Sequence, residues 1–185
     1  MKDYIRLSNA KAYQLLNSGA MILISTVSAN GKYDIAPIAW QCPIDYDPVT
    51  RLLFVCDSDH QTFKNISETR QFGISVPHVS QLILVKEVGS CSGRDNDKFS
   101  KFNIQTFQPE NINCLFPEDC IGYIECRVYN IITDCSVSLV FGEVLSSKAD
   151  REAYNMRLLS EAEAGKTIHH LGGKIFISTG DNIIK

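Results

Sequence analysis

The sequence of 185 residues lacks several features that mark particular classes of protein. No apolar run reaches the roughly 18 residues that a membrane-spanning helix needs. The formal net charge is −3, so the chain has no excess of the basic side chains that bind nucleic acid. The N-terminal segment carries charges where a secretory signal would need an apolar stretch. We therefore expect a cytoplasmic protein that binds neither nucleic acid nor membranes.

Several motifs of cofactor and metal chemistry are also missing. The chain has seven cysteines but no Cys-x-x-Cys pair, which argues against a zinc knuckle or a dithiol redox site. The neighbouring His169 and His170 face opposite ways in an extended chain, so we predict no metal site. No Gly-x-Gly-x-x-Gly follows a strand, and no Gly-x-Ser-x-Gly elbow is present. We expect reduced cysteines that pack mostly as small apolar residues.

The length and apolar content fit a single domain over residues 1–185. Short β-rich runs predict strands at 21–28, 33–41, 52–57, 71–76, 121–132, 136–147 and 173–179. Helical spacing predicts helices at 8–16, 61–70, 78–88 and 150–163. Because strands and helices do not alternate regularly, the pattern favours a mainly β fold, a small closed or partly closed antiparallel barrel.

Turn residues refine this prediction. Asn30 and Gly31 form a strong hairpin signal between the first two predicted strands. Pro37 lies inside the second of them and cannot donate a hydrogen bond to a neighbour, so that strand should lie at an edge or carry a bulge. Residues 102–120 have little periodicity and contain two prolines. We expect a long loop there, serving as a lid, a ligand wall or a partner contact.

The stretch CDSDHQTFKNI, residues 56–66, joins a predicted strand to a predicted helix. The first turn of a helix leaves backbone N–H groups unpaired, and its dipole favours an anion, so this stretch suits a phosphate monoester. An ordinary capped helix, with Ser58 or Asp59 as N-cap, is the alternative. Asp57 and Asp59 would repel phosphate unless they point away. The candidate phosphate-binding residues are Ser58, Asp59, Thr62, Lys64 and Asn65.

The segment around Pro37 is a second candidate site. An edge strand interrupted by proline leaves backbone N–H and C=O groups free to contact the edge of a flat heterocycle. The alternative for Trp40 is a core position, and the alternative for Cys42 is simple packing. The candidate ring-binding residues are Ala36, Pro37, Ile38, Ala39, Trp40, Gln41 and Cys42.

The polar stretch SGRDNDKF, residues 92–99, is a third candidate. Arg94 and Lys98 carry positive charges suited to a phosphate or to a nicotinamide cofactor. A solvated loop is the alternative. We include Lys98 among the candidate cofactor-binding residues, and we predict no catalytic side chain.

Three segments in this order resemble the flavin reductase-like family, the FMN-binding split barrels, and in particular its flavoredoxin-type branch. They are LISTVSANGKYDIAPIAW (23–40), TFKNISETRQFGISVP (62–77), and SGRDNDKF (92–99) followed by IGYIECRVYNIITDCSVSLVFGEV (121–144). The resemblance implies a six-stranded antiparallel Greek-key split barrel with short peripheral helices, forming a homodimer with FMN at the interface. It implies FMN phosphate at residues 58–65 and the isoalloxazine ring along residues 36–42.

The resemblance further implies a flavoprotein oxidoreductase, with NADH or NADPH as electron donor. The alternatives are an FMN electron-transfer protein that a partner protein reduces, and a pyridoxamine phosphate oxidase-like protein. Two positions depart from the family pattern. Asp34 stands where Asn is frequent, and Val137 lies near the place of a frequent histidine. The missing histidine bears on nicotinamide turnover more than on FMN binding.

Overall fold

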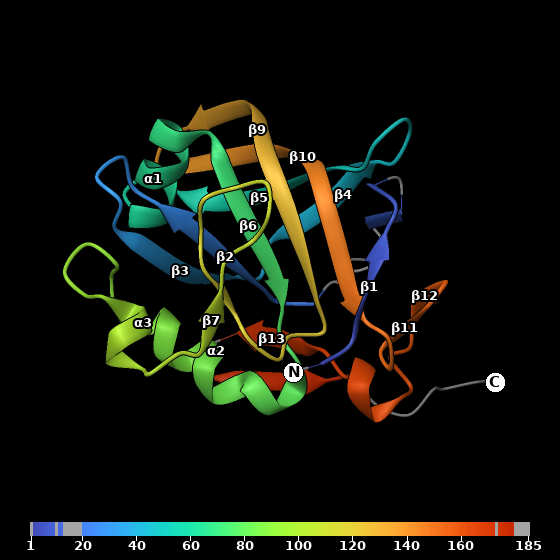
Figure 1. The fold of residues 1–185 in the computed structure, drawn as a ribbon. Helices are drawn as coiled ribbons and strands as arrows, with labels where there is room; N and C mark the ends of the chain where they lie inside the picture. Colours follow the sequence, from blue (N-terminus) through green and yellow to red (C-terminus); the bar gives the residue numbers. More distant parts are fainter. Residues whose placement is uncertain (1, 10, 13–19, 173, 180–185) are drawn as a thin grey trace.

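The computed structural model describes residues 2–9, 11, 12, 20–172 and 174–179. One large antiparallel sheet dominates the structure, in the strand order β3-β2-β6-β9-β10-β5-β4, with β1 paired to β10 (Figure 1). Its strands are β1 (Tyr4–Leu7), β2 (Ile22–Val27), β3 (Tyr33–Ile38), β4 (Gln41–Asp45), β5 (Arg51–Asp57), β6 (Gln71–Val76), β9 (Gly122–Asp134) and β10 (Val137–Asp150).

The sheet closes on itself because one segment supplies both of its ends. β3 and β4 stand at opposite ends of the strand order, yet only Ala39 and Trp40 separate them in sequence. The Trp40 carbonyl accepts a hydrogen bond of 2.9 Å from the Val55 N–H, which attaches the bend to β5. With β3 and β4 taken as one bent strand, the barrel has six strands. The predicted mainly β, six-stranded antiparallel split barrel is confirmed.

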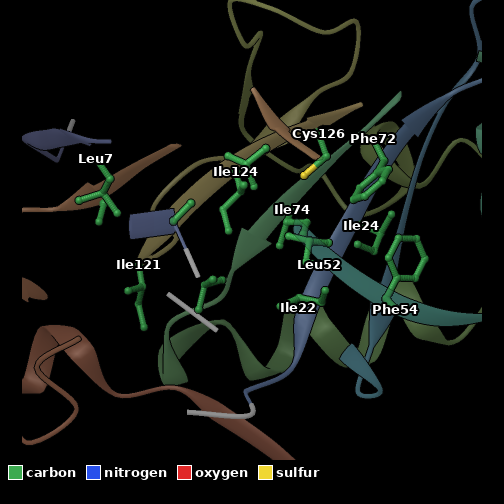
Figure 2. Close-up of a cluster of buried hydrophobic side chains, with 14 of the residues drawn as sticks. Leu7, Ile22, Ile24, Leu52, Phe54, Phe72, Ile74, Ile121, Ile124 and Cys126 are labelled. Atoms are coloured by element: carbon green, nitrogen blue, oxygen red, sulfur yellow. The ribbon is translucent and has the colours of Figure 1, made fainter. Parts of the chain in front are cut away.

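The barrel interior is filled by apolar residues from β1, β2, β5, β6, β9 and β10. In β5, Leu52, Phe54 and Cys56 point inward while their neighbours are partly exposed. Figure 2 shows side chains of β2, β5, β6 and β9 converging on this core. Phe54 and Phe72 meet edge to face, with ring centroids 5.1 Å apart. Each such side chain contributes about 1.5–3 kcal/mol to stability through its burial.

The helices cover the barrel from outside. α1 (Gln61–Thr69) buries Thr62, Asn65 and Ile66, and it packs chiefly against β2. The 3₁₀ turn η2 (Val79–Gln81) leads into α2 (Leu82–Gly89), whose Val85 and Val88 pack near β3 in a second apolar cluster. The short α3 (Lys98–Lys101) also contacts β3. None of the described helices has the length and apolar character needed to cross a membrane.

Several local predictions are confirmed. β2 and β3 form a hairpin in which Gly31 adopts a positive φ of 84°, the conformation that favours glycine in such turns. Pro37 lies in β3, at the edge of the hydrogen-bonded order. Residues 102–120 are largely irregular, apart from the two-residue strands β7 (Thr106–Phe107) and β8 (Phe116–Pro117).

The helix predicted over residues 150–163 is wrong. The chain there forms the small hairpin β11 (Tyr154–Asn155) and β12 (Arg157–Leu158), followed by the 3₁₀ turn η3 (Glu163–Gly165). Met156 turns the hairpin with a φ of 57°, which no α-helix allows. Tyr154 and Leu158 face the barrel core, so tertiary packing overrides the local helical tendency.

Two predictions concern the chain ends. The helix expected over residues 8–16 lies largely outside the described residues. The expected final strand is present as β14 (Ile175–Ser178), and it pairs with β13 (Ile168–Gly172), which the sequence did not predict.

Candidate functional site

A cavity of about 400 Å³ lies beside the edge strand β3. Three parts of the chain line it together with Lys98 of α3. β3 contributes Asp34 and Ala36–Ile38, the start of α1 contributes His60–Thr62, and the end of α2 with its following loop contributes 88–93. All three segments selected from the sequence, 36–42, 56–66 and 92–99, therefore contribute residues to one cavity.

A buried ion pair fixes one wall of this cavity. Lys98 Nζ lies 3.1 Å from Asp34 Oδ1 and donates a hydrogen bond of 2.7 Å to the Ile35 carbonyl. Thr62 donates from its hydroxyl to Asp34 Oδ2 over 3.3 Å. Asp34 and Lys98 are 2% and 3% exposed, so each charge depends on the other for compensation.

Residues 90–97 are held across the cavity by backbone and side-chain contacts. Gly93 packs directly on Asp34, since a Cβ added there would lie 2.2 Å from Oδ1. The Arg94 guanidinium donates to the Asp59 carbonyl over 3.0 Å, and Lys32 donates to the Arg94 carbonyl over 2.8 Å. The loop is thereby joined both to the β2–β3 hairpin and to the start of α1.

Asp97 places Lys98. Its side chain caps α3 by accepting from the Ser100 backbone N–H at 3.2 Å, and it also accepts from the Ser100 hydroxyl. The hydrogen bonds from Ser100 hold the pKa of Asp97 below its usual value, so it remains an ionised cap. Capping thus orients the first residue of α3 toward β3.

The start of α1 opens into the cavity without a side-chain cap. His60 occupies the N-cap position but makes no hydrogen bond to the amides of the first turn. The Asp57 carboxylate accepts from the Asp59 N–H at 2.9 Å, and neither aspartate lines the cavity. The uncapped amides and the helix dipole therefore favour an anion at this end of the cavity.

The structure brings some of the sequence-predicted site residues together. Those that line the cavity are Ala36, Pro37, Ile38, Thr62 and Lys98. Lys98, expected in a polar surface loop, is instead buried and paired. Ala39 lines a neighbouring cavity on the other side of Pro37.

The other candidates lie elsewhere. Trp40 is 72% exposed, Cys42 is exposed on β4, and Gln41 donates to the Ala20 carbonyl. The Ser58 hydroxyl contacts that of Ser138 at 2.9 Å. Lys64 is exposed, as is Asp59, whereas Asn65 is buried between Thr26 and Gln61, to which it is hydrogen-bonded. Among the described residues, none of these seven candidates lines the 400 Å³ cavity.

Of the segment 88–93 that lines the cavity, the sequence analysis selects only Ser92 and Gly93, as part of the stretch 92–99. Val88–Gly93 contains the run Gly-Ser-Cys-Ser-Gly, which allows the backbone to approach other groups closely. The contact between Gly93 and Asp34 is an example of such an approach. His60 and Gln61 also line the cavity, and the sequence analysis does not predict them.

Comparison with known proteins identifies the family. Residues 15–166 match the family model of the flavin reductase-like domain, so the chain belongs to that family. The protein YddH of Escherichia coli K12 is 30% identical over 99% of this chain and 98% of its own length.

Solved structures agree in fold. An FMN-binding domain of a flavin reductase-like enzyme from Shewanella baltica OS155 is 26% identical, with a TM-score of 0.87, covering 100% of this chain and 98% of its own. Flavoredoxin from Desulfovibrio vulgaris is 18% identical, with a TM-score of 0.76, covering 90% and 89% of the two chains. The predicted resemblance is confirmed.

The Asp34–Lys98 pair generates a stability prediction. Asp34→Asn leaves the Lys98 ammonium buried without a counter-charge, so we expect the free energy of unfolding to fall by about 3–5 kcal/mol. Urea denaturation measures this loss. The double variant Asp34→Asn/Lys98→Met removes both charges and should recover most of the stability. A single variant as stable as the unmodified chain would show that the pair does not brace the wall.

Proposed function

We propose that this protein is an FMN-binding flavoprotein oxidoreductase that takes electrons from NADH or NADPH. The observation that carries the proposal is the cavity in which an uncapped helix start, a threonine hydroxyl and an edge strand meet. The chain belongs to the flavin reductase-like family, and its relative from Shewanella baltica is described as an FMN-binding domain.

The residues present fit FMN. Amides of the first turn of α1 suit the phosphate because they supply donors to an anion. The Thr62 hydroxyl, which donates to Asp34 Oδ2 in this structure, would turn to donate to the same anion. The backbone of Ala36–Ile38 offers an edge for the ring. The one carboxylate at the cavity, Asp34, is paired with Lys98 and adds no uncompensated negative charge. The cavity of about 400 Å³ falls within the usual size of a small-molecule site.

When bound, FMN supplies hydride and electron transfer itself. The chain then binds and orients the cofactor, and the Asp34–Lys98 pair keeps the adjoining wall rigid. No side chain needs to act as nucleophile or general acid.

An electron-transfer protein without nicotinamide turnover is the second candidate. Val137, at the start of β10, replaces the histidine that the family resemblance associates with the flavin side. Steady-state oxidation of NADH or NADPH with FMN as acceptor separates the two functions, and failure with both nucleotides favours the carrier. A pyridoxamine phosphate oxidase-like function fits less well, because the cavity's one described lysine is already paired with Asp34.

We further propose that residues 1–185 act as one domain in the cytoplasm. All seven cysteines are free, and Cys42 and Cys135 are exposed. Exposed free thiols are typical of a reducing compartment.

A homodimer completes the proposal. Trp40, Ile44 and Tyr46 expose 72%, 46% and 59% of their surface around β4, next to the strand that lines the cavity. Adjacent apolar side chains of this size favour a protein interface. A second copy of the chain on this surface would cover them close to the flavin site.

FMN binding gives a direct prediction. The purified protein should bind FMN and show absorption bands near about 370 and 450 nm. Thr62→Ala removes a hydroxyl donor from the proposed phosphate site and should weaken FMN binding by about 10- to 100-fold. Fluorescence titration measures the dissociation constant.

Ser67→Ala is the matched control for Thr62→Ala, because it removes a hydroxyl from the exposed face of the same helix. It should bind FMN as the unmodified chain does. Lys64→Ala should cost less affinity than Thr62→Ala, since Lys64 is exposed and does not line the cavity. A protein that takes up no FMN, or a Thr62→Ala variant with unchanged affinity, would contradict the proposed site.

The homodimer is testable through Trp40, the only tryptophan of the chain. In a dimer that covers β4, its fluorescence should lie at shorter wavelength than that of the urea-unfolded chain. Dilution should move the emission to longer wavelength as light scattering reports half the mass. A monomer at every concentration, with the emission of a fully solvated tryptophan, would reject this interface.

A further inference from the structure

A second cavity, of about 500 Å³, lies against the first. Pro37, Gly89 and Ser90 line both. Pro37 and Gly89 touch closely, since a Cβ added to Gly89 would lie 3.0 Å from Pro37 Cγ. Because the two cavities share these lining residues of β3 and the end of α2, a molecule in one would lie near a molecule in the other.

The floor of the second cavity is apolar. Met21, Ala39 and Val85 come from the barrel side and α2, and Phe176 comes from the β13–β14 hairpin. His170 stacks on Phe176, with ring centroids 4.9 Å apart and planes at 30°. Flat apolar walls of this kind suit a planar ring.

The titratable side chains of this cavity are all potential cations. They are Lys86, His170 and Lys174, and among the residues that the structure describes no carboxylate lines it. Within the described part of the chain, neither Lys86 nor Lys174 forms an ion pair or a side-chain hydrogen bond. The whole chain has a net charge of −3, whereas the described residues that line this cavity include two unpaired lysines next to apolar side chains. Their charge is complementary to an anion.

We propose that the second cavity binds a small aromatic carboxylate, with its ring on the apolar floor and its carboxylate between Lys86 and Lys174. This inference rests on the proposed function, because the bound acid would then lie next to the flavin as an effector. A one-ring acid fits within about 500 Å³ without rearrangement of the barrel.

Calorimetric titration of the FMN-loaded protein with benzoate tests the inference, with benzyl alcohol as the neutral probe of similar size. Benzoate should bind at least tenfold more tightly than the alcohol, and raised salt should weaken only benzoate. Lys86→Ala/Lys174→Ala should lower benzoate affinity about tenfold while leaving FMN uptake unchanged. Lys11→Ala, an exposed lysine outside both cavities, is the matched control and should have no effect.

Three results would overturn the inference. They are equal affinity for benzoate and benzyl alcohol, benzoate binding that survives loss of both lysines, and benzoate that displaces FMN, which would assign the second cavity to the flavin. The same titration on flavin-free protein separates the two proposals. If no FMN binds, the proposed function fails, and benzoate binding to the flavin-free chain still decides whether the cavity is an acid site.

Discussion

One continuous segment, Tyr33–Asp45, supplies both ends of the main sheet, and the rest of the molecule is arranged around it. Its two halves pair with β2 on one side and β5 on the other. Pro37 has no N–H to give to a further strand, so β3 ends the hydrogen-bonded order, and the bend at Ala39 and Trp40 carries the segment over to β5. The closure and the free strand edge thus belong to the same segment. The candidate cavity lies at that edge.

Contacts of two buried charged side chains join this edge to the segment that follows α2. Asp34 of β3 pairs with Lys98 of α3, and Gly93 packs on the same carboxylate. The pair joins the β2–β3 hairpin to α3, which lies more than fifty residues further along the sequence. The family resemblance leads one to expect asparagine at position 34. The aspartate found there is paired with the buried Lys98, so its charge is compensated.

Much of the fold was predictable from the sequence, because strand periodicity, the Asn30–Gly31 turn and Pro37 each act locally. The helix expected over 150–163 was wrong, since packing of Tyr154 and Leu158 on the core overrides local tendency there.

The site was predictable only in part. Thr62 and the residues around Pro37 could be predicted as site residues from their residue types and their positions next to a helix start and in an edge strand. The sequence predicts Lys98 as a surface cation. Its ion pair could not be predicted, because Asp34 is distant in sequence and the fold alone brings the two together. The loop 88–93 consists of small residues whose role is close approach, which depends on the fold.

We propose that flavin occupies the cavity between β3, the start of α1 and residues 88–93. Cys91 lines this cavity, whereas the exposed Cys42 and Cys135 do not. Burial raises the pKa of Cys56 to about 12, so that thiol should not react with the alkylating reagent. Alkylation rates read by mass spectrometry, with and without FMN, therefore test the claim directly. Saturating FMN should slow modification of Cys91 alone, and an unchanged rate at Cys91 would contradict it.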